Sequence, residues 1–193
     1  MRLSALPEAA SWNHHSGRVG FEVAFFRAAQ DGHRLTGHTT AHESPVCWSV
    51  GYDIRVDRAW RTRAVSAIGL SVAGERTVTA ARDEENRWTV DGVRRPDLDG
   101  CVDVDLESSA VTNTLPVHRI DFRVGVGVDL PAVFIRADDL RVERLDQRYT
   151  LIDASADRPV LHYESSTFDV SCELQLDGAG LVLAYPGIAT RDG

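Results

Sequence analysis

Lysine is absent from this chain of 193 residues, and its 21 basic side chains other than histidine are all arginines. The absence excludes three classes of protein whose chemistry depends on a lysine. P-loop nucleotide hydrolases need one on the phosphates, pyridoxal-phosphate enzymes need one for the Schiff base, and protein kinases need one to pair with ATP. A coding bias toward arginine is the simplest cause, so no positive function follows from it.

Cysteine and long apolar runs are also scarce. Cys47, Cys101 and Cys172 are odd in number, widely spaced and never part of a C-x-x-C pair. Small buried thiols in a reducing compartment explain this pattern best, so we expect a cytoplasmic protein. The segment Met1–Trp12 has no apolar run of signal-peptide length. No stretch approaches the roughly 18 apolar residues of a transmembrane helix.

The charge balance is acidic, with a formal net charge of −8. Nucleic acids demand a basic surface, so we expect no nucleic-acid partner. Adhesion to anionic lipid by charge alone is disfavoured for the same reason. Hydrophobic residues make up 43% of the chain, which is typical of a globular protein. A chain of this length can bury a core without disulfides or a structural metal.

Recognisable catalytic and cofactor motifs are missing. No G-x-S-x-G nucleophile elbow occurs. Gly125 and Gly127 lack the third glycine of a dinucleotide fingerprint and do not open a helix. Cys101 has no histidine partner implied by the sequence, so a buried, unreactive thiol is the better interpretation. We expect no cofactor.

The histidines match no metal-binding template. Structural zinc sites use close, regular spacings with cysteine or carboxylate partners. Five histidines of the N-terminal part depart from such spacings, namely His14, His15, His33, His38 and His42. We interpret them as solvated histidines in loops or at strand ends, and we expect no bound metal.

Alternation of apolar and polar residues with a period of two dominates the chain. The clearest case is Cys101–Glu107. A strand there places Val102, Val104 and Leu106 on one face and the acidic residues on the other. Similar stretches cover residues 51–56, 77–81, 87–90, 122–128, 133–135, 141–152, 168–176 and 181–185.

Turn residues separate these stretches and complete the predicted fold. Residues 82–86 predict a hairpin connection, and glycines mark turns at 91–92 and 177–180. Only residues 1–10 and 113–119 favour short helices. The chain therefore predicts an all-β fold with a curled antiparallel sheet (a spiral β-roll or an open, barrel-like sheet), few short helices and a single domain over residues 1–193.

Two acidic residues of the clearest strand are candidates for function. Asp103 and Asp105 lie on the same face, about 7 Å apart. Such a pair can act as acid and base or bind sugar hydroxyls, although a solvated strand face explains it equally simply. A polar cluster, Thr112–Arg119, follows directly. Its residue types satisfy backbone groups in turns and caps, and they also bind hydroxyls and amides, so the spacing alone does not decide.

Aromatic side chains offer a second kind of contact. Most of the four tryptophans and of the tyrosines Tyr52, Tyr149, Tyr163 and Tyr185 are expected in the core or in cross-strand pairs. In a curled sheet some would face an internal cavity, where their flat rings could contact lipid tails or sugar rings.

Several segments together resemble one bacterial family, named putative glycolipid-binding and formerly a domain of unknown function. The similar segments, in chain order over nearly the whole sequence, are residues 20–22, 52–63, 100–106, 112–119, 147–149 and 180–187. The resemblance implies an all-antiparallel, spirally rolled sheet, similar in outline to bacterial lipoprotein carriers, with a concave surface suited to a lipid-bearing ligand. The pair His118-Arg119 departs from the family, which more often has two arginines, so the resemblance does not imply that both positions bind the same anionic group.

Three functions stay open on the sequence. The favoured one is non-catalytic binding of a small amphipathic ligand, such as a glycolipid, in the concave face of the rolled sheet. Its candidate binding residues are Asp103, Asp105, Asn113, Thr114, His118, Arg119, Gln147, Tyr149 and Tyr185. The first alternative is a hydrolase or isomerase with Asp103, Asp105 and His118 as acid–base groups. The second is a protein-interaction module that pairs through a sheet edge.

The orientation of strand 101–107 distinguishes these functions. If Val102, Val104 and Leu106 line a cavity that side chains do not fill, an acyl chain is the natural occupant. If they meet a packed core, the acidic side chains face solvent or a cleft.

Overall fold

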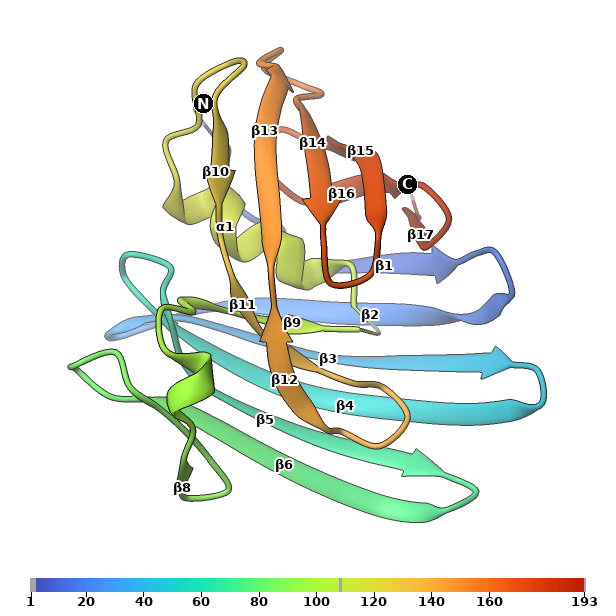
Figure 1. Cartoon of the computed structure of the whole chain (residues 1–193). Helices are drawn as coiled ribbons and strands as arrows, with labels where there is room; N and C mark the ends of the chain where they lie inside the picture. Colours follow the sequence, from blue (N-terminus) through green and yellow to red (C-terminus); the bar gives the residue numbers. More distant parts are fainter. Residues whose placement is uncertain (1–2, 108, 193) are drawn as a thin grey trace.

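Two arms of one large sheet dominate the computed structural model, which describes residues 3–107 and 109–192 (Figure 1). The long arm contains β1 (Ala9–His14), β2 (Arg18–Ala29), β3 (Gly32–Glu43), β4 (Val46–Asp57), β5 (Thr62–Ser71), β6 (Gly74–Arg82), β7 (Trp88–Val90) and β8 (Val93–Arg94). The short arm contains β10 (Gly127–Asp129), β13 (Gln147–Asp153), β14 (Val160–Ser165), β15 (Val170–Leu176), β16 (Val182–Tyr185) and β17 (Ala189–Arg191).

All 14 strands of this sheet are antiparallel to their neighbours, and the pair β1–β17 joins the arms. The strand order is β10-β13-β14-β15-β16-β17-β1-β2-β3-β4-β5-β6-β7-β8. Its two end strands, β10 and β8, do not pair with each other among the described residues. The sheet is therefore curled but not closed into a barrel, which confirms the predicted fold class.

A second, smaller sheet lies against the inner face of the long arm (Figure 1). Its three strands are β12 (Val142–Leu145), β11 (Ala132–Ile135) and β9 (Asp103–Leu106). The pair β11–β12 is antiparallel, but β9 runs parallel to β11. This pair is the exception to the all-antiparallel sheet that the family resemblance implied.

Within residues 3–107 and 109–192, helical structure is limited to three short elements, the 3-10 helices η1 (Pro96–Leu98) and η2 (Val111–Asn113) and the helix α1 (Thr114–Arg119). The segment η2–α1 lies between the two arms, next to β9 (Figure 1). Among the described residues, no helix has the length and apolar character needed to cross a membrane.

Period-two alternation places one face of the long arm in the core. In β4, for example, Val50, Tyr52 and Ile54 are buried, whereas their outward neighbours are more exposed. The inner face packs against the small sheet, whose Val104 and Leu106 are each only 1% exposed. Because side chains of β9 and α1 fill this space, the concave face of the roll is mostly core rather than open groove.

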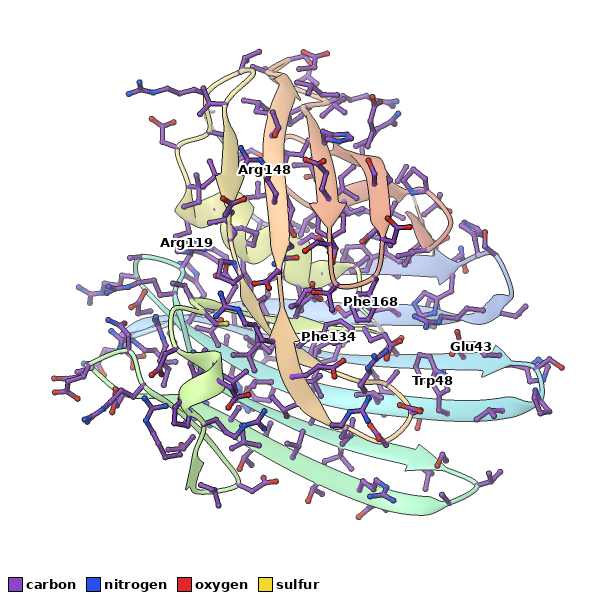
Figure 2. The ribbon with its side chains drawn as sticks, viewed as in Figure 1. Glu43, Trp48, Arg119, Phe134, Arg148 and Phe168 are labelled. Carbon is purple, nitrogen blue, oxygen red and sulfur yellow. The ribbon has the colours of Figure 1, made fainter. Side chains whose placement is uncertain are left out.

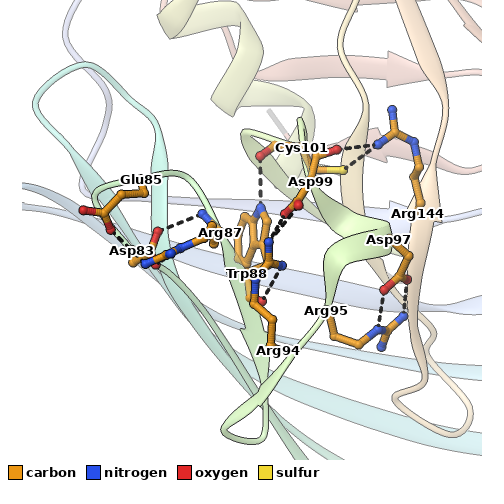
Figure 3. Close-up of polar contacts among 10 residues, drawn as sticks. All are labelled: Asp83, Glu85, Arg87, Trp88, Arg94, Arg95, Asp97, Asp99, Cys101 and Arg144. Atoms are coloured by element: carbon orange, nitrogen blue, oxygen red, sulfur yellow. Dashed lines mark hydrogen bonds and ion pairs between the residues drawn. The ribbon is translucent and has the colours of Figure 1, made fainter.

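Hydrogen bonds and an arginine–carboxylate pair hold the segment between β6 and β9 in place (Figure 3). Arg94 binds the two carboxylate oxygens of Asp99 at 2.8 and 2.7 Å. Trp88 is fully buried, and its indole Nε1 donates to the carbonyl oxygen of Cys101 at 3.0 Å. Arg144 of β12 donates to the carbonyl oxygen of Asp99 at 2.9 Å. The exposed ion pairs add little free energy individually, but together they hold the chain where β9 begins.

Several local predictions are confirmed. The alternating stretch 51–56 lies within β4, and the stretches 77–81 and 87–90 form the hairpin β6–β7. The predicted helix over 113–119 corresponds to α1 and the end of η2. Residues 133–135 lie in β11, and residues 182–185 form β16.

Two predicted strands are interrupted. Only residues 127 and 128 of the stretch 122–128 are strand, at the start of β10, because Gly125 adopts a φ of +78° and Val124 makes a single bridge to Leu151. The stretch 141–152 is divided at Asp146, whose amide donates to Thr167 Oγ1 at 3.0 Å instead of continuing a ladder. Its two parts, β12 and β13, belong to different sheets.

Three further predictions were wrong. The N-terminal segment is not helical where it is described, because residues 3–7 are irregular and β1 begins at Ala9; residues 1 and 2 lie outside the described residues. His38 lies in the middle of β3 rather than in a loop or at a strand end, whereas His33 and His42 lie next to the two ends of this strand as predicted. Cys47 is exposed on β4, contrary to the expectation of buried thiols.

Candidate functional site

A cavity of about 290 Å³ opens where the two arms and the small sheet meet. We call it the tyrosine pocket. Its polar lining consists of Asp105, Ser109, Asn113, Tyr163, Ser165 and Tyr185, and its apolar lining consists of Leu106, Phe134, Leu145, Phe168, Val170 and Ile188. The remaining lining residues are His15, Ser16, Arg18, Glu43, Glu107 and Gly187. One side of the pocket is therefore hydrogen-bonding and another is aromatic and aliphatic.

Asp105 is the acidic group of the polar lining. Its strand position directs it away from the core positions of Val104 and Leu106, into the pocket. Thr112 Oγ1 donates a hydrogen bond to its Oδ1 at 2.8 Å. Burial, with smaller effects from the nearby charges of Asp103 and Glu107, raises the pKa of Asp105 to about 7. Near neutral pH the pocket thus contains a carboxyl group that is partly protonated.

Three tyrosines form a row beside this acid. The rings of Tyr149 and Tyr163 meet edge to face with centroids 5.1 Å apart, and Tyr163 meets Tyr185 in the same way at 5.8 Å. Burial raises the pKa of both Tyr163 and Tyr185, so their phenols are neutral. Tyr163 and Tyr185 line the pocket, whereas Tyr149 lies behind it. The Tyr149 hydroxyl donates to Asn113 Oδ1 at 2.9 Å and thereby orients the amide of Asn113.

A buried glutamate, Glu22 of β2, holds the segment that carries Asn113. Tyr52 donates to Glu22 Oε1 at 2.6 Å, the Ser109 hydroxyl donates to the same oxygen, and the Ala110 amide donates to Oε2 at 2.8 Å. Glu22 is fully buried, and this burial raises its pKa to about 7. Glu22 is not among the site residues predicted from the sequence. Its signal is a glutamate that shares the inward face of β2 with Ala24 and Phe26.

The more exposed lining is charged, but its charges are largely paired. Arg18 Nε donates to Glu43 Oε1 at 2.8 Å, and Arg18 Nη1 donates to the carbonyl oxygen of Glu107 at 2.9 Å. The Arg136 guanidinium lies 5.5 Å from the ring centre of Phe134 and 5.0 Å from that of Phe168. Figure 2 shows Phe134 and Phe168 side by side and Glu43 beyond them toward the hairpin tips. Two phenylalanines and an arginine thus border the pocket.

Comparison with known proteins decides the family. The model of the family described as "Putative glycolipid-binding" matches residues 9–191. The chain belongs to this family.

Two solved structures are similar to the chain. One is a DUF1089 family protein from Pseudomonas aeruginosa, with 28% sequence identity and a TM-score of 0.76 over 89% of this chain and 92% of that one. The other, a beta-barrel-like protein of the domain of unknown function DUF1849 from Brucella abortus, has 10% identity and a TM-score of 0.54 over 98% and 95% of the two chains. The second likeness concerns the fold alone. No curated protein matches the chain.

The family assignment confirms the resemblance, and the structure now places each predicted site residue. Asp105, Asn113 and Tyr185 line the tyrosine pocket. Tyr149 and Gln147 form a layer behind it, with the Tyr149 hydroxyl 3.3 Å from Gln147 Oε1. These five residues come from β9, η2, β16 and β13, so the fold brings together positions that are far apart in the sequence.

Asp103 and Arg119 form a separate buried ion pair. Arg119 Nε donates to Asp103 Oδ1 at 3.2 Å, and its Nη2 binds the other oxygen. The side chains of Asp103 and Arg119 are only 2% and 13% exposed. Neither residue lines the tyrosine pocket, and Figure 2 shows Arg119 on the opposite side of the molecule from Glu43. The geometry is that of a clamp between β9 and α1.

His118 and Thr114 also lie away from the tyrosine pocket. His118 lines a second cavity of about 380 Å³, where its ring stacks on Trp60 at 4.1 Å and Trp60 stacks on His33 at 4.4 Å. Its Nε2 donates to the carbonyl oxygen of Ala179 at 2.8 Å. Thr114 is fully buried in α1. Asp105 and His118 therefore do not converge on a common point.

The orientation of the 101–107 segment answers the question that the sequence left open. Val104 meets packed core, Asp105 faces the tyrosine pocket, and Leu106 is buried in the core at the border of this pocket. Within residues 3–107 and 109–192, no cluster of three or more histidine, cysteine or acidic side chains could hold a metal ion.

Proposed function

We propose that this protein binds a small amphipathic molecule of the glycolipid type in the tyrosine pocket and does so without catalysis. One observation carries the proposal: a single cavity combines hydroxyl, amide and carboxyl groups with two adjacent phenylalanines. Such a pocket matches a ligand with a polar head and an apolar continuation. The family name supports the same class of ligand.

The volume of the pocket limits what it encloses. At about 290 Å³ it lies at the lower end of the range of ligand sites, roughly 300–1,000 Å³. In our proposal it holds one head-group ring and the first part of a tail. Phe168, which is 37% exposed at the edge of the pocket, contacts the tail where it leaves.

The two alternative functions gain no support from the geometry. An acid–base enzyme that uses Asp103, Asp105 and His118 needs these groups within reach of one reacting atom, but Asp103 pairs with Arg119 and His118 lines another cavity. Pairing through a sheet edge needs a long free strand. The end strands of the large sheet, β8 and β10, have two and three residues.

Thermal and chemical unfolding in the presence of octyl glucoside, below its critical micelle concentration, tests the proposal. A ligand at 100 times its dissociation constant adds about 2.7 kcal/mol to the free energy of unfolding. We expect this stabilisation for the unmodified protein and a loss of it in Phe168→Ser. Phe25→Ser, which changes an exposed phenylalanine of β2 outside the pocket, is the matched control and should retain it.

Native mass spectrometry after gentle purification provides an independent readout. Absence of any co-purifying amphipath, together with no stabilisation by a panel of alkyl glycosides, would contradict the proposed function. Equal loss of stabilisation in Phe25→Ser and Phe168→Ser would place binding outside the tyrosine pocket.

A further inference from the structure

More acidic than basic side chains line the tyrosine pocket. Three lining residues are acids, Glu43, Asp105 and Glu107, whereas Arg18 is the one arginine among the lining residues. Arg18 is already engaged, because it donates to Glu43 and to the backbone of Glu107. An anionic head group would therefore enter a site whose cationic side chain has partners of its own.

Asp105 differs from the other two acids of the lining. Glu43 pairs with Arg18, and Glu107 lies 3.5 Å from Arg136 and accepts the amide of Ala137 at 3.0 Å. Among the described residues, no arginine or histidine forms a salt bridge with Asp105. The charged groups that act on it most strongly are Asp103 and Glu107, which are also acidic. Asp105 is thus the acid whose negative charge the pocket does not offset.

The other polar groups around Asp105 are neutral. Tyr163 and Tyr185 offer phenol hydroxyls, Asn113 an amide and Ser165 a hydroxyl. Such groups donate to and accept from alcohols and ring oxygens. A partly protonated Asp105 adds one more group that donates or accepts, because its burial disfavours the charged form. A permanently cationic head group without N–H donors could not use these hydrogen-bonding groups.

We propose that the tyrosine pocket selects uncharged, hydroxyl-bearing head groups and rejects anionic ones, and that Asp105 is the residue that sets this preference. The inference rests on the proposed function and narrows it. It separates neutral glycosides from fatty acids, phospholipids and phosphorylated or sulfated glycolipids, all of which are amphipathic. A bound anion must either lie beside the charge of Asp105 or have that acid protonated, and two pH units above its pKa of about 7 the protonation alone lowers the affinity by about 100-fold.

Three amphiphiles with the same octyl chain test the selectivity by titration calorimetry at about pH 9, roughly two units above the pKa of Asp105, where this acid is ionised. They are octyl glucoside, which is uncharged, octyl phosphate, which is anionic, and octyltrimethylammonium, which is cationic. For the unmodified protein we expect octyl glucoside to bind at least tenfold more tightly than octyl phosphate, and we expect the cation, which the unpaired charge of Asp105 attracts, to bind more tightly than octyl phosphate as well. This comparison needs no variant, so it does not depend on how a substitution affects folding.

Asp105→Asn then tests the role of the residue. The amide keeps the shape of the side chain and can still accept from Thr112. We expect the affinity for octyl phosphate to rise at least tenfold and that for octyl glucoside to change less than about threefold. Glu173→Gln, which removes the same charge from an exposed position of β15, should leave all three affinities unchanged.

The outcomes separate this inference from the function on which it rests. Binding of octyl phosphate as tight as that of octyl glucoside would overturn the selectivity but keep the binding function. If Asp105→Asn keeps the same preference for octyl glucoside over octyl phosphate, Asp105 does not determine the head-group selectivity. Absence of binding by all three amphiphiles would defeat the proposed function itself.

Discussion

Replacement of Glu22 by glutamine perturbs the buried group that holds the Ser109–Asn113 segment to the large sheet. Glu22 accepts hydrogen bonds from two hydroxyls and one backbone amide, and it has no basic partner among these contacts. Glutamine can keep this arrangement, since its oxygen accepts from the Ala110 amide while its NH₂ group donates to the hydroxyl oxygens of Tyr52 and Ser109. The variant therefore mimics the protonated acid.

The size of the effect follows from the shift in the pKa of Glu22. Burial raises it from 4.5 to about 7 in the folded protein. The folded state then binds more protons than the unfolded state between these values, so stability falls as the pH rises from about 4.5 and levels off above about 7. The loss is about 3 kcal/mol for the whole interval. Glutamine cannot ionise, so Glu22→Gln removes this share of the pH dependence.

Urea unfolding followed by tryptophan fluorescence at several pH values measures the difference. We expect the free energy of unfolding of Glu22→Gln, relative to that of the unmodified protein, to increase by about 3 kcal/mol between about pH 4.5 and about pH 8, which means that the variant gains relative stability. Any loss of stability caused by the substitution that does not depend on pH cancels in this comparison. Glu173→Gln, at an exposed position, is the control and should give a curve parallel to that of the unmodified protein. A parallel curve for Glu22→Gln would refute the reasoning.

Two further predictions concern the buried ion pair Asp103–Arg119 and the three cysteines. Arg119→Met leaves Asp103 charged and buried, so it should lower the free energy of unfolding by about 3–5 kcal/mol. The double variant Asp103→Asn/Arg119→Met should recover part of that loss in the same urea assay, and no recovery would show that the loss does not arise from the unpaired charge. Cys47 is exposed, whereas burial raises the pKa of Cys101 and Cys172 to about 11. One thiol per native chain should therefore react rapidly with an aromatic disulfide reagent, and Cys47→Ser should abolish that fast phase.

The alternation of apolar and polar residues predicts which segments form strands, but it does not predict where each strand begins and ends. Stretches such as 51–56 and 77–81 keep a clean period of two and lie in β4 and β6. The stretch 122–128 has the same pattern, yet Val124 and Val126 are exposed. A strand needs a neighbouring strand to pair with as well as an alternating sequence, and the positive φ of Gly125 interrupts the pairing there. Partner choice depends on the tertiary arrangement, which one sequence does not reveal.

The candidate site was predictable to a similar degree. Alternation correctly places Asp103 and Asp105 on one face of β9, but it cannot tell which of them meets an arginine. Arg119 reaches Asp103 from α1, and Thr112 reaches Asp105 from η2. Tyr163 and Phe168 join the pocket from the β14–β15 hairpin, which no local pattern connects to β9. The lining is assembled from distant strands, so its composition depends on how the sheet curls.

The segment Ser109–Asn113 connects these observations. It is held on one side by Glu22 of the large sheet and on the other by Asp105 of the small sheet, through the hydroxyls of Ser109 and Thr112. Both acids have pKa values raised to about 7 by burial, and both contribute to placing Asn113 in the pocket. A structural role alone would be served equally well by neutral amides, as the Glu22→Gln variant tests. Glu22 has no access to the pocket lining, whereas Asp105 does. If the acid at position 105 serves a ligand rather than the fold, Asp105→Asn should change head-group preference while Glu22→Gln changes only stability.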